Sequence, residues 1–164
     1  GGSSVDGLIG KSHLDRQDLM EGIMKVALGQ EKYFTLFGED FHTPDKTAVR
    51  DYLHVEDIAE AHILALEKIN SLSGNTLPAG RQVFNLGSEK GYSVKEVIEE
   101  AERIIGIEIP VKVAPRRDGD VEKAVASSAK AKEILGWQRK FSDLETIIKT
   151  DWLWRKNHPF GYKN

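Results

Sequence analysis

Cysteine is absent from this chain, and so is any uninterrupted run of about 18 apolar residues. Without cysteine the chain can form no disulfide and offers no thiolate nucleophile or metal ligand, which fits a reducing compartment and leads us to expect a cytoplasmic protein. No signal-like N-terminus is present, so neither export nor membrane insertion is predicted. The formal net charge of −3 also argues against a broad nucleic-acid or membrane-binding surface.

The chain does have enough apolar sequence for a core. It contains 164 residues, of which 40% are hydrophobic and 30% charged, with no internal repeat, heptad pattern or low-complexity tract. A chain of this size can bury a core of its own, and its length indicates one domain. Short alternating segments and amphipathic segments follow one another, which indicates a mixed α/β fold.

Apolar periodicity and capping residues predict helices. We expect them at residues 16–28, 56–69, 94–105, 128–135 and 142–155. Asp15 is placed to cap the first of these. Ser93 and Glu96 form a capping box before the third, and Ser142 and Glu145 form another at the start of the fifth. The second helix is apolar around most of its circumference and therefore requires neighbours on several sides.

Strands are predicted at residues 33–37, 48–55, 82–86 and 109–113. Alternation along the second strand places Arg50, Tyr52 and His54 on one face. An arginine held on a strand beside an aromatic ring is pre-organised to meet an anion. A surface strand with a chance arginine is the alternative.

The fourth strand leads into the segment Ala114-Pro115-Arg116-Arg117-Asp118-Gly119-Asp120, which we name the arginine loop. Planar guanidinium groups bind phosphate oxygens two at a time. The loop is therefore a candidate phosphate site, although most charged loops are simply solvated. A diphosphate needs more than one cation, and Arg50 with Arg117 would supply two if the fold brings them together.

The remaining polar and aromatic residues give no second chemistry. The histidines do not stand in metal-ligand spacing, so no metal site is predicted: they are His13, His42, His54, His62 and His158. No Ser-His-Asp arrangement follows from spacing. Trp137, Trp152 and Trp154 are expected to fill the core.

Several motifs in order resemble the C-terminal half of the UDP-glucose 4-epimerase family, a group of extended short-chain dehydrogenases/reductases. The motifs are Ser4-Val5-Asp6-Gly7-Leu8-Ile9-Gly10, Phe37-Gly38-Glu39-Asp40-Phe41, Arg50-Asp51-Tyr52-Leu53-His54-Val55-Glu56-Asp57, Val83-Phe84-Asn85-Leu86-Gly87 and the arginine loop. The resemblance covers essentially the whole chain. It implies an isomerase of galactose metabolism that uses NAD and interconverts UDP-glucose and UDP-galactose.

The resemblance also implies substrate-binding roles. Arg50 and Arg117 match residues that hold the diphosphate, and Asp120 matches an acceptor for the ribose hydroxyls. The strand with Thr35, Leu36 and Phe37 matches one that reads uracil through its backbone. Tyr52 would help to shape the wall of the pocket.

Two positions depart from the family pattern. Asp18 stands where the family usually has an amide or imidazole donor, and its carboxylate would repel the diphosphate. Glu21 stands where the family usually has proline. Ala124 stands where some members carry a bulky tyrosine, so N-acetylated sugars are expected to fit.

The family's NAD-binding and catalytic motifs are missing from these residues. No tyrosine is followed four places later by lysine, and the 15 glycines form no Gly-x-Gly-x-x-Gly spacing. We therefore expect residues 1–164 to form one UDP-sugar-binding domain, the C-terminal substrate-binding portion of an extended Rossmann-type enzyme lacking the dinucleotide-binding core. Residues 55–69 and 82–87 are expected to pack on that missing core.

The expected cofactor of the complete enzyme is NAD, and the expected partner is a UDP-sugar; a second copy of the chain, as a homodimer, is a further candidate. By itself the chain is expected to hold no catalytic residue and to be inactive. Two alternatives remain: a stand-alone nucleotide-sugar-binding module, and a non-catalytic interaction domain.

Overall fold

The computed structural model describes residues 1–12, 18–71 and 82–162, which form five helices and five short strands. The helices are α1 (Leu19–Ala27), α2 (Val55–Ser71), α3 (Val94–Ile105), α4 (Ala129–Leu135) and α5 (Leu144–Asn157). The strands are β1 (Phe34–Phe37), β2 (Val49–Arg50), β3 (Tyr92–Ser93), β4 (Val111–Ala114) and β5 (Lys123–Ala124). The predicted mixed α/β class is confirmed.

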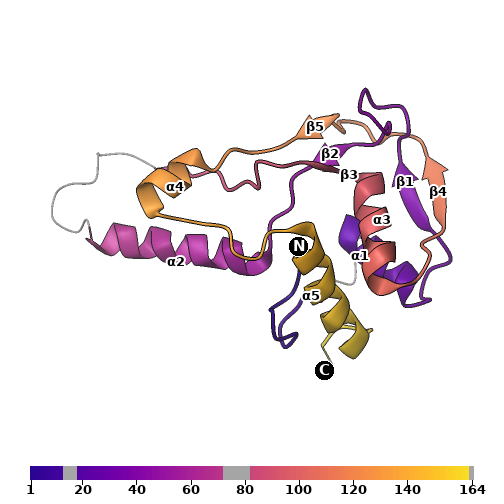
Figure 1. Cartoon of the computed structure of the whole chain (residues 1–164), viewed down its shortest axis with the longest axis horizontal. Helices are drawn as coiled ribbons and strands as arrows, with labels where there is room; N and C mark the ends of the chain where they lie inside the picture. The colour runs from indigo at the N-terminus through magenta and orange to yellow at the C-terminus, as the bar shows by residue number, and fades with distance from the viewer. Residues whose placement is uncertain (13–17, 72–81, 163–164) are drawn as a thin grey trace.

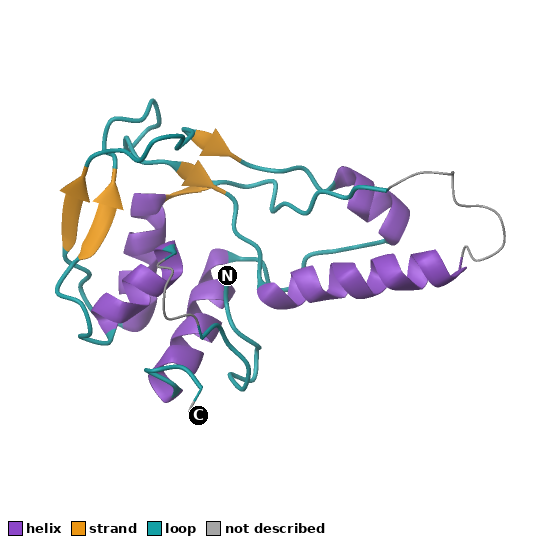
Figure 2. Ribbon diagram, turned by 180° about the vertical axis from the view of Figure 1, so that it is seen from behind, coloured by secondary structure: helices purple, strands orange, loops and turns teal. Residues whose placement is uncertain are grey.

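These elements form two lobes (Figure 1). The first lobe contains α1, α3 and α5 beside the strands β1 and β4. The second contains α2 and α4, and α2 extends well away from the first lobe; the view from behind shows the same separation (Figure 2). None of the helices in the described part of the chain has the length and apolar character needed to cross a membrane.

The core of the first lobe lies where its three helices meet β1. Ile23 and Met24 on α1, Val97 on α3, and Ile147 and Ile148 on α5 are completely buried. Burying one side chain of this kind contributes roughly 1.5–3 kcal/mol. The apolar residues of all three helices therefore meet in one shared core.

A smaller core joins α2 to α4 around the buried ring of Trp137. Its Nε1 donates a hydrogen bond of 2.7 Å to the main-chain oxygen of Asp57. The buried Asp57 carboxylate accepts from the amides of Lys140 and Phe141 at 2.9 and 3.1 Å and from the hydroxyl of Ser142. A buried carboxylate is tolerated when it is hydrogen-bonded in this way. Asp57 thereby fixes the segment before α5 to the first turn of α2.

The strands form two small sheets. In the first, β1 and β4 are parallel, with Phe34 opposite Val111 and Phe37 opposite Ala114. In the second, β2 lies between β3, which is antiparallel to it, and β5, which is parallel. The pairs involving β3 and β5 are two residues long, and the sequence carried no alternating pattern that would predict them.

Helix caps agree with the sequence in one case and correct it in two. The capping box of Ser93 with Glu96 opens α3. Asp18, which the prediction placed inside the first helix, has an extended backbone and caps α1 instead; the predicted start at Arg16 and the predicted cap Asp15 lie outside the described residues. Asp143 caps α5 and accepts from the Thr146 amide. The hydroxyl of Ser142, the predicted cap, instead donates a hydrogen bond to the Asp57 carboxylate.

Two predicted strands are also corrected. The strand expected at 48–55 is paired only at Val49 and Arg50, because Val55 already begins α2. His54 consequently leaves the face of Arg50 and Tyr52 and is buried against Thr150 of α5. Residues 82–86 form no strand, since no described strand lies beside them to complete a ladder. The side chains of Phe84 and Leu86 pack against the Trp137 core instead, whereas Val83 is exposed.

His54 forms the junction between the lobes. Its Nδ1 accepts a hydrogen bond of 3.2 Å from the Glu56 amide, so the ring proton is on Nε2, which lies 3.0 Å from Oγ1 of Thr150. Burial lowers the pKa of His54 below its ordinary value of 6.5, and the nearby carboxylates of Asp57 and Glu56 offset only part of this effect. The folded protein therefore holds the ring neutral.

This environment predicts acid sensitivity. Because the unfolded chain binds a proton at His54 before the folded one does, stability is full above pH 6.5 and falls as the pH drops below that value, by up to about 1.4 kcal/mol per pH unit. In urea unfolding, His54→Asn should lose this part of the pH dependence. His42→Asn is the matched control, since the His42 side chain is 90% exposed. Equal slopes for wild type and His54→Asn would contradict the neutral, buried ring.

Candidate functional site

Parallel strand pairing fixes the arginine loop at both ends. Before the loop, β4 pairs with β1, and the Gly38 amide donates to the Ala114 carbonyl at 2.9 Å. After it, β5 pairs with β2, which carries Arg50. Parallel strands have their carboxyl ends at the same edge of a sheet. The loop therefore runs from the end of β1 to the side of β2 and brings Arg117 and Asp120 to Arg50.

Asp120 connects the two predicted cations. Its carboxylate accepts from Nε and Nη2 of Arg117 at 2.9 and 3.2 Å, and its Oδ1 lies 4.0 Å from Nη2 of Arg50. Such a two-point contact fixes the plane of the guanidinium. The Arg117 side chain is nevertheless 62% exposed. Both cations are therefore held in one place while much of Arg117 remains open to a ligand.

The two adjacent arginines of the loop have different surroundings. The guanidinium of Arg117 lies 5.0 Å from the centre of the Phe37 ring, at the cavity described below. That of Arg116 lies 4.0 Å from the centre of the Phe41 ring, and its Nε is 3.8 Å from Asp40. Cation–π contacts of this kind orient each side chain. Arg117 is thus directed to the cavity, whereas Arg116 supports the outside of the loop.

A cavity of about 380 Å³ lies between α1, β1, β2 and the arginine loop. The structure brings together eight of the predicted site residues on its lining: Asp18, Thr35, Leu36, Phe37, Arg50, Tyr52, Arg117 and Asp120. Ala124 is not part of the lining; it lies on β5 opposite Arg50 in the strand ladder. The lining also includes residues that sequence reasoning missed: Leu19, Gly22, Glu31, Tyr33, Phe34, Ala48 and Val94. Gly22 could have been predicted, because it follows Asp18 by four positions and residues at this spacing lie on the same face of a helix.

Strand β1 presents an unpaired edge of backbone. The amides of Phe34 and Gly38 donate toward the β4 side, at 2.7 and 2.9 Å. Because backbone groups alternate sides along a strand, those of Thr35 and Phe37 point the other way. No strand in the described part of the chain pairs with that edge. Two amide donors and two carbonyl acceptors are therefore available beside residues that line the cavity.

Tyr52 contributes a protonated hydroxyl to the wall. Burial raises the pKa of Tyr52 to about 12, although the positive charge of Arg50 acts in the opposite direction. The phenol thus stays neutral across the physiological range and can donate a hydrogen bond. Tyr52 is one of the residues that line the cavity.

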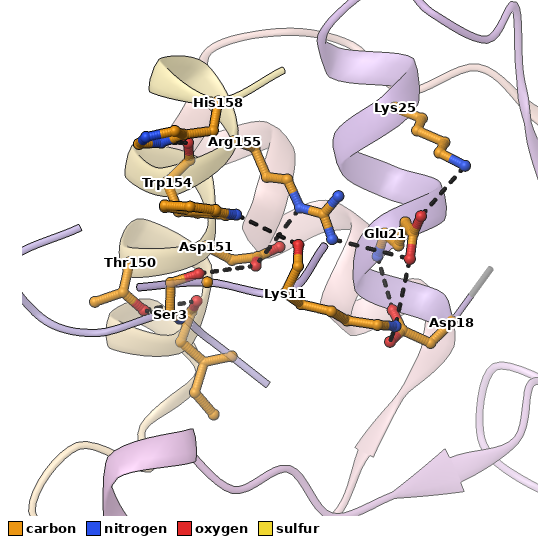
Figure 3. Close-up of polar contacts among 12 residues, drawn as sticks. Ser3, Lys11, Asp18, Glu21, Lys25, Thr150, Asp151, Trp154, Arg155 and His158 are labelled. Carbon is orange, nitrogen blue, oxygen red and sulfur yellow. Dashed lines mark hydrogen bonds and ion pairs between the residues drawn. The ribbon is translucent and has the colours of Figure 1, made fainter. Parts of the chain in front are cut away.

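Asp18 lies at the cavity with its charge already paired (Figure 3). One oxygen accepts from the Glu21 amide at 2.9 Å, and the other contacts Nζ of Lys11. Burial alone would raise the pKa of Asp18, but the hydrogen bonds from Lys11 and Glu21 outweigh it and lower that pKa. The carboxylate is therefore ionised and neutralised by a lysine that sequence reasoning missed.

No group of three or more histidine, aspartate or glutamate side chains in the described part of the chain is arranged to hold a metal ion. The site is therefore defined by two arginines, a carboxylate that joins them, an open strand edge and aromatic walls. This arrangement suits a ligand that combines a phosphate group with a planar hydrogen-bonding ring.

Comparison with known proteins identifies relatives of this chain. A family model described as GDP-mannose 4,6 dehydratase matches residues 8–150. UDP-glucose 4-epimerase of Lactobacillus helveticus is 43% identical over 163 residues, which are 99% of this chain and 48% of that protein. UDP-glucose 4-epimerase of Halalkalibacterium halodurans is 44% identical over 98% of this chain and 46% of its own length.

Solved structures agree in fold. A crystal structure of UDP-glucose 4-epimerase superposes with a TM-score of 0.89 at 41% identity, covering 99% of this chain and 48% of the other. The Bifidobacterium longum UDP-glucose 4-epimerase, in complex with NAD⁺ and UDP, superposes with a TM-score of 0.86 at 33% identity, covering 98% and 46%. The chain spans about half the length of the relatives it matches.

The chain therefore belongs to the family described as GDP-mannose 4,6 dehydratase, among the extended short-chain dehydrogenases/reductases. Within that class it is similar to the C-terminal portion of the UDP-glucose 4-epimerases, as its motifs predicted.

The site geometry predicts that Gly38 is essential to the turn after β1. It has φ +85°, and a Cβ there would lie 2.5 Å from Cγ of Arg116 and 2.6 Å from the Phe41 ring. Gly38→Ala should therefore destabilise the protein by about 2–4 kcal/mol in urea unfolding. Gly29→Ala is the matched control: its φ is +71° but nothing lies within 4 Å. We expect about 1–2 kcal/mol from its backbone strain alone. Equal losses would mean that the turn is not crowded.

Proposed function

We propose that this chain is the UDP-sugar-binding part of an NAD-dependent UDP-glucose 4-epimerase, and that it anchors the UDP group of the substrate. The observation that carries the proposal is the single cavity shared by Arg50, Arg117 and the open edge of β1. It is supported by the relatives, one of which was crystallised with NAD⁺ and UDP. The complete enzyme would interconvert UDP-glucose and UDP-galactose in galactose metabolism.

In this proposal the diphosphate lies between Arg50 and Arg117. Both guanidiniums approach the Asp120 carboxylate, and the exposed part of Arg117 leaves donors for a ligand. Charge-assisted hydrogen bonds of this kind contribute roughly 1.5–3 kcal/mol each. A carboxylate has about four lone-pair directions. Asp120 can therefore bond Arg117 and still accept from the ribose hydroxyls.

The uracil would be recognised along β1. Its ring carries one N–H donor flanked by two carbonyl acceptors, and the outward backbone of Thr35 and Phe37 offers both complementary types. The buried Leu36 anchors the strand in the core. Because backbone groups do not change rotamer, this edge would bind the base without reorganisation. Phosphate contacts would supply affinity, and the strand edge would supply the choice of base.

The residues of this chain do not fit an NAD site. The side chains of Asp18, Ser93 and Asp143 cap the N-termini of α1, α3 and α5. The first turn of α2 contains acidic side chains. Neither arrangement leaves those four helix N-termini free for a pyrophosphate. The N-terminus of α4 has no side-chain cap, but the helix is seven residues long and no glycine-rich turn precedes it. We assign hydride and proton transfer at the sugar C4 to residues outside this chain. The role left to this chain is to hold the nucleotide while the sugar reacts at C4.

The sugar end of the site would be permissive. Ala124 is a small residue on β5, opposite Arg50 in the strand ladder, and would leave space at a position where the resemblance implies a tyrosine in some family members. One structural neighbour, at 35% identity and a TM-score of 0.72, is a UDP-Glc/GlcNAc 4-epimerase from Campylobacter jejuni. We therefore include N-acetylated UDP-sugars among the proposed ligands.

The exposed face of α2 is proposed to pack on the dinucleotide-binding portion of the enzyme. Ile63, Leu66 and Ile69 are 56%, 61% and 53% exposed, and Val83 of the adjacent extended segment is 58% exposed. Large apolar side chains exposed at this spacing along one helix usually mark an interaction site. The proposal assigns residues 55–69 and 82–87 to that interface.

The nucleotide site is tested with Arg117→Ala. Isothermal titration with UDP should show affinity about ten- to a hundredfold weaker than wild type, as expected for one charge-assisted contact. Arg103→Ala is the matched control, because Arg103 is an exposed arginine on α3 whose partners are Glu100 and Glu145. If UDP bound wild type and Arg117→Ala equally, Arg117 would not belong to the site. If wild type bound no UDP, the proposed function would be wrong.

The interface proposal predicts that the chain self-associates at micromolar concentration. Light scattering should show oligomers that dissociate in the double variant Ile63→Gln/Leu66→Gln. Val121→Gln, at a 53% exposed valine before β5, should leave them unchanged. A monomer whose α2 amides are also strongly protected from hydrogen exchange would contradict the assignment, because the helix would then need no partner.

A further inference from the structure

The charges lining the cavity are not by themselves favourable to an anion. Two arginines, Arg50 and Arg117, stand against three carboxylates, those of Asp18, Glu31 and Asp120, in the part of the lining that the structure describes. Asp120 is held by the arginines. Asp18 lies at the start of α1, and no arginine in the described part of the chain forms an ion pair or hydrogen bond with it. An uncompensated carboxylate at this position would oppose a diphosphate.

Lys11 supplies the missing compensation from outside the cavity. Its Nζ contacts Oδ2 of Asp18 and lies 3.3 Å from Oε2 of Glu21. Lys11 comes from the N-terminal segment and is not one of the residues that line the cavity. Its side chain is 29% exposed, so solvent screens the pair only in part.

Glu21 gives Lys11 a second, buried anchor (Figure 3). The Glu21 side chain is 1% exposed, and its other contacts are with Lys25 at 3.2 Å and Arg155 at 3.9 Å. Arg155 in turn lies 3.9 Å from Asp151 of the same helix. If Lys11 is removed, Glu21 therefore keeps its contacts with two cations, whereas Asp18 keeps no ion pair within the described residues and only the longer-range charge of Arg155. The effect of losing Lys11 falls mainly on the cavity.

We propose that Lys11 is a positioning residue of the nucleotide site: by pairing with Asp18 it removes a repulsive charge and lets the cavity accept a diphosphate. This inference rests on the proposed function. Lys11 acts through Asp18 and does not contact the ligand.

The test is a double-mutant cycle measured by titration with UDP. Lys11→Met should weaken UDP binding about five- to thirtyfold, because the Asp18 charge is exposed to the diphosphate. Asp18→Asn should bind UDP at least as well as wild type, since asparagine caps a helix as well as aspartate does. In the Asp18→Asn background, Lys11→Met should change the affinity by less than about twofold. Lys11→Arg should restore most of the wild-type affinity.

Lys25→Met is the matched control. It removes a cation from the same Glu21 cluster, yet Lys25 neither contacts Asp18 nor lines the cavity. We expect its UDP affinity to match wild type. Thermal unfolding of each variant shows whether the fold is retained.

A second readout does not depend on a nucleotide. The pKa of Asp18, followed by carboxyl carbon NMR, should rise in Lys11→Met and stay unchanged in Lys25→Met. Among the described residues, the charged groups that act on Asp18 are Lys11 and the Gly1 amino group from the N-terminal segment, Arg155 and Asp151 from α5, and Glu21 from its own helix. Only the first of these is changed by Lys11→Met.

The outcomes separate this inference from the proposed function. If wild type binds UDP and Lys11→Met binds it equally well, the inference is overturned and the proposed function stands. A penalty that persists in the Asp18→Asn background also overturns it, because Lys11 would then act by another route. If wild type binds no UDP, the proposed function fails, and the role of Lys11 as its positioning residue fails with it. An unchanged Asp18 pKa in Lys11→Met overturns the charge pairing under either result.

Discussion

The cavity of the candidate site depends on the parallel pairing at both ends of the arginine loop. Main-chain hydrogen bonds hold β4 beside β1 and β5 beside β2. The loop between them has little freedom, and its Asp120 lies within reach of Arg117 and Arg50. Arg50 and Arg117 are far apart in the sequence, and backbone pairing places both of them at one cavity. The open edge of β1 borders the same space because β4 occupies its other side.

Charge balance is the second constraint on this site. Each cation that faces the cavity has a carboxylate nearby, and Asp18 is balanced by Lys11 from outside the lining. Such pairing reduces side-chain mobility before a ligand arrives. It also means that a count of arginines overstates how positive the cavity is. The charge that α1 brings to the cavity therefore depends on its capping residue Asp18 and on the pairing of Asp18 with Lys11.

The sequence predicted the elements whose signals are local. The capping box at Ser93 and the apolar periodicity of α1 and α3 depend on neighbouring residues only, and both are present. Ser142 failed as a cap because Asp57, 85 positions away, binds its hydroxyl. The two-residue strands β3 and β5 exist only through distant partners, so no local pattern could reveal them.

The site was predicted better than its surroundings. Eight expected residues line the cavity because the motifs were carried over from a family whose fold this chain shares. Lys11 was missed because its contact with Asp18 depends on the tertiary fold, which the spacing of residues in the sequence does not reveal. His54 was misplaced because the strand ends at Arg50 and the helix begins at Val55.

The central claim is that UDP binds in the cavity with its uracil along β1 and its diphosphate between the two arginines. An amide NMR titration with UDP tests this directly. The account predicts saturable shifts of the Thr35 and Phe37 amides and of the Arg50 and Arg117 side-chain resonances. Saturation with shifts confined elsewhere, for example to the basic depression formed by Lys132, Arg139 and Lys140 before α5, would contradict it.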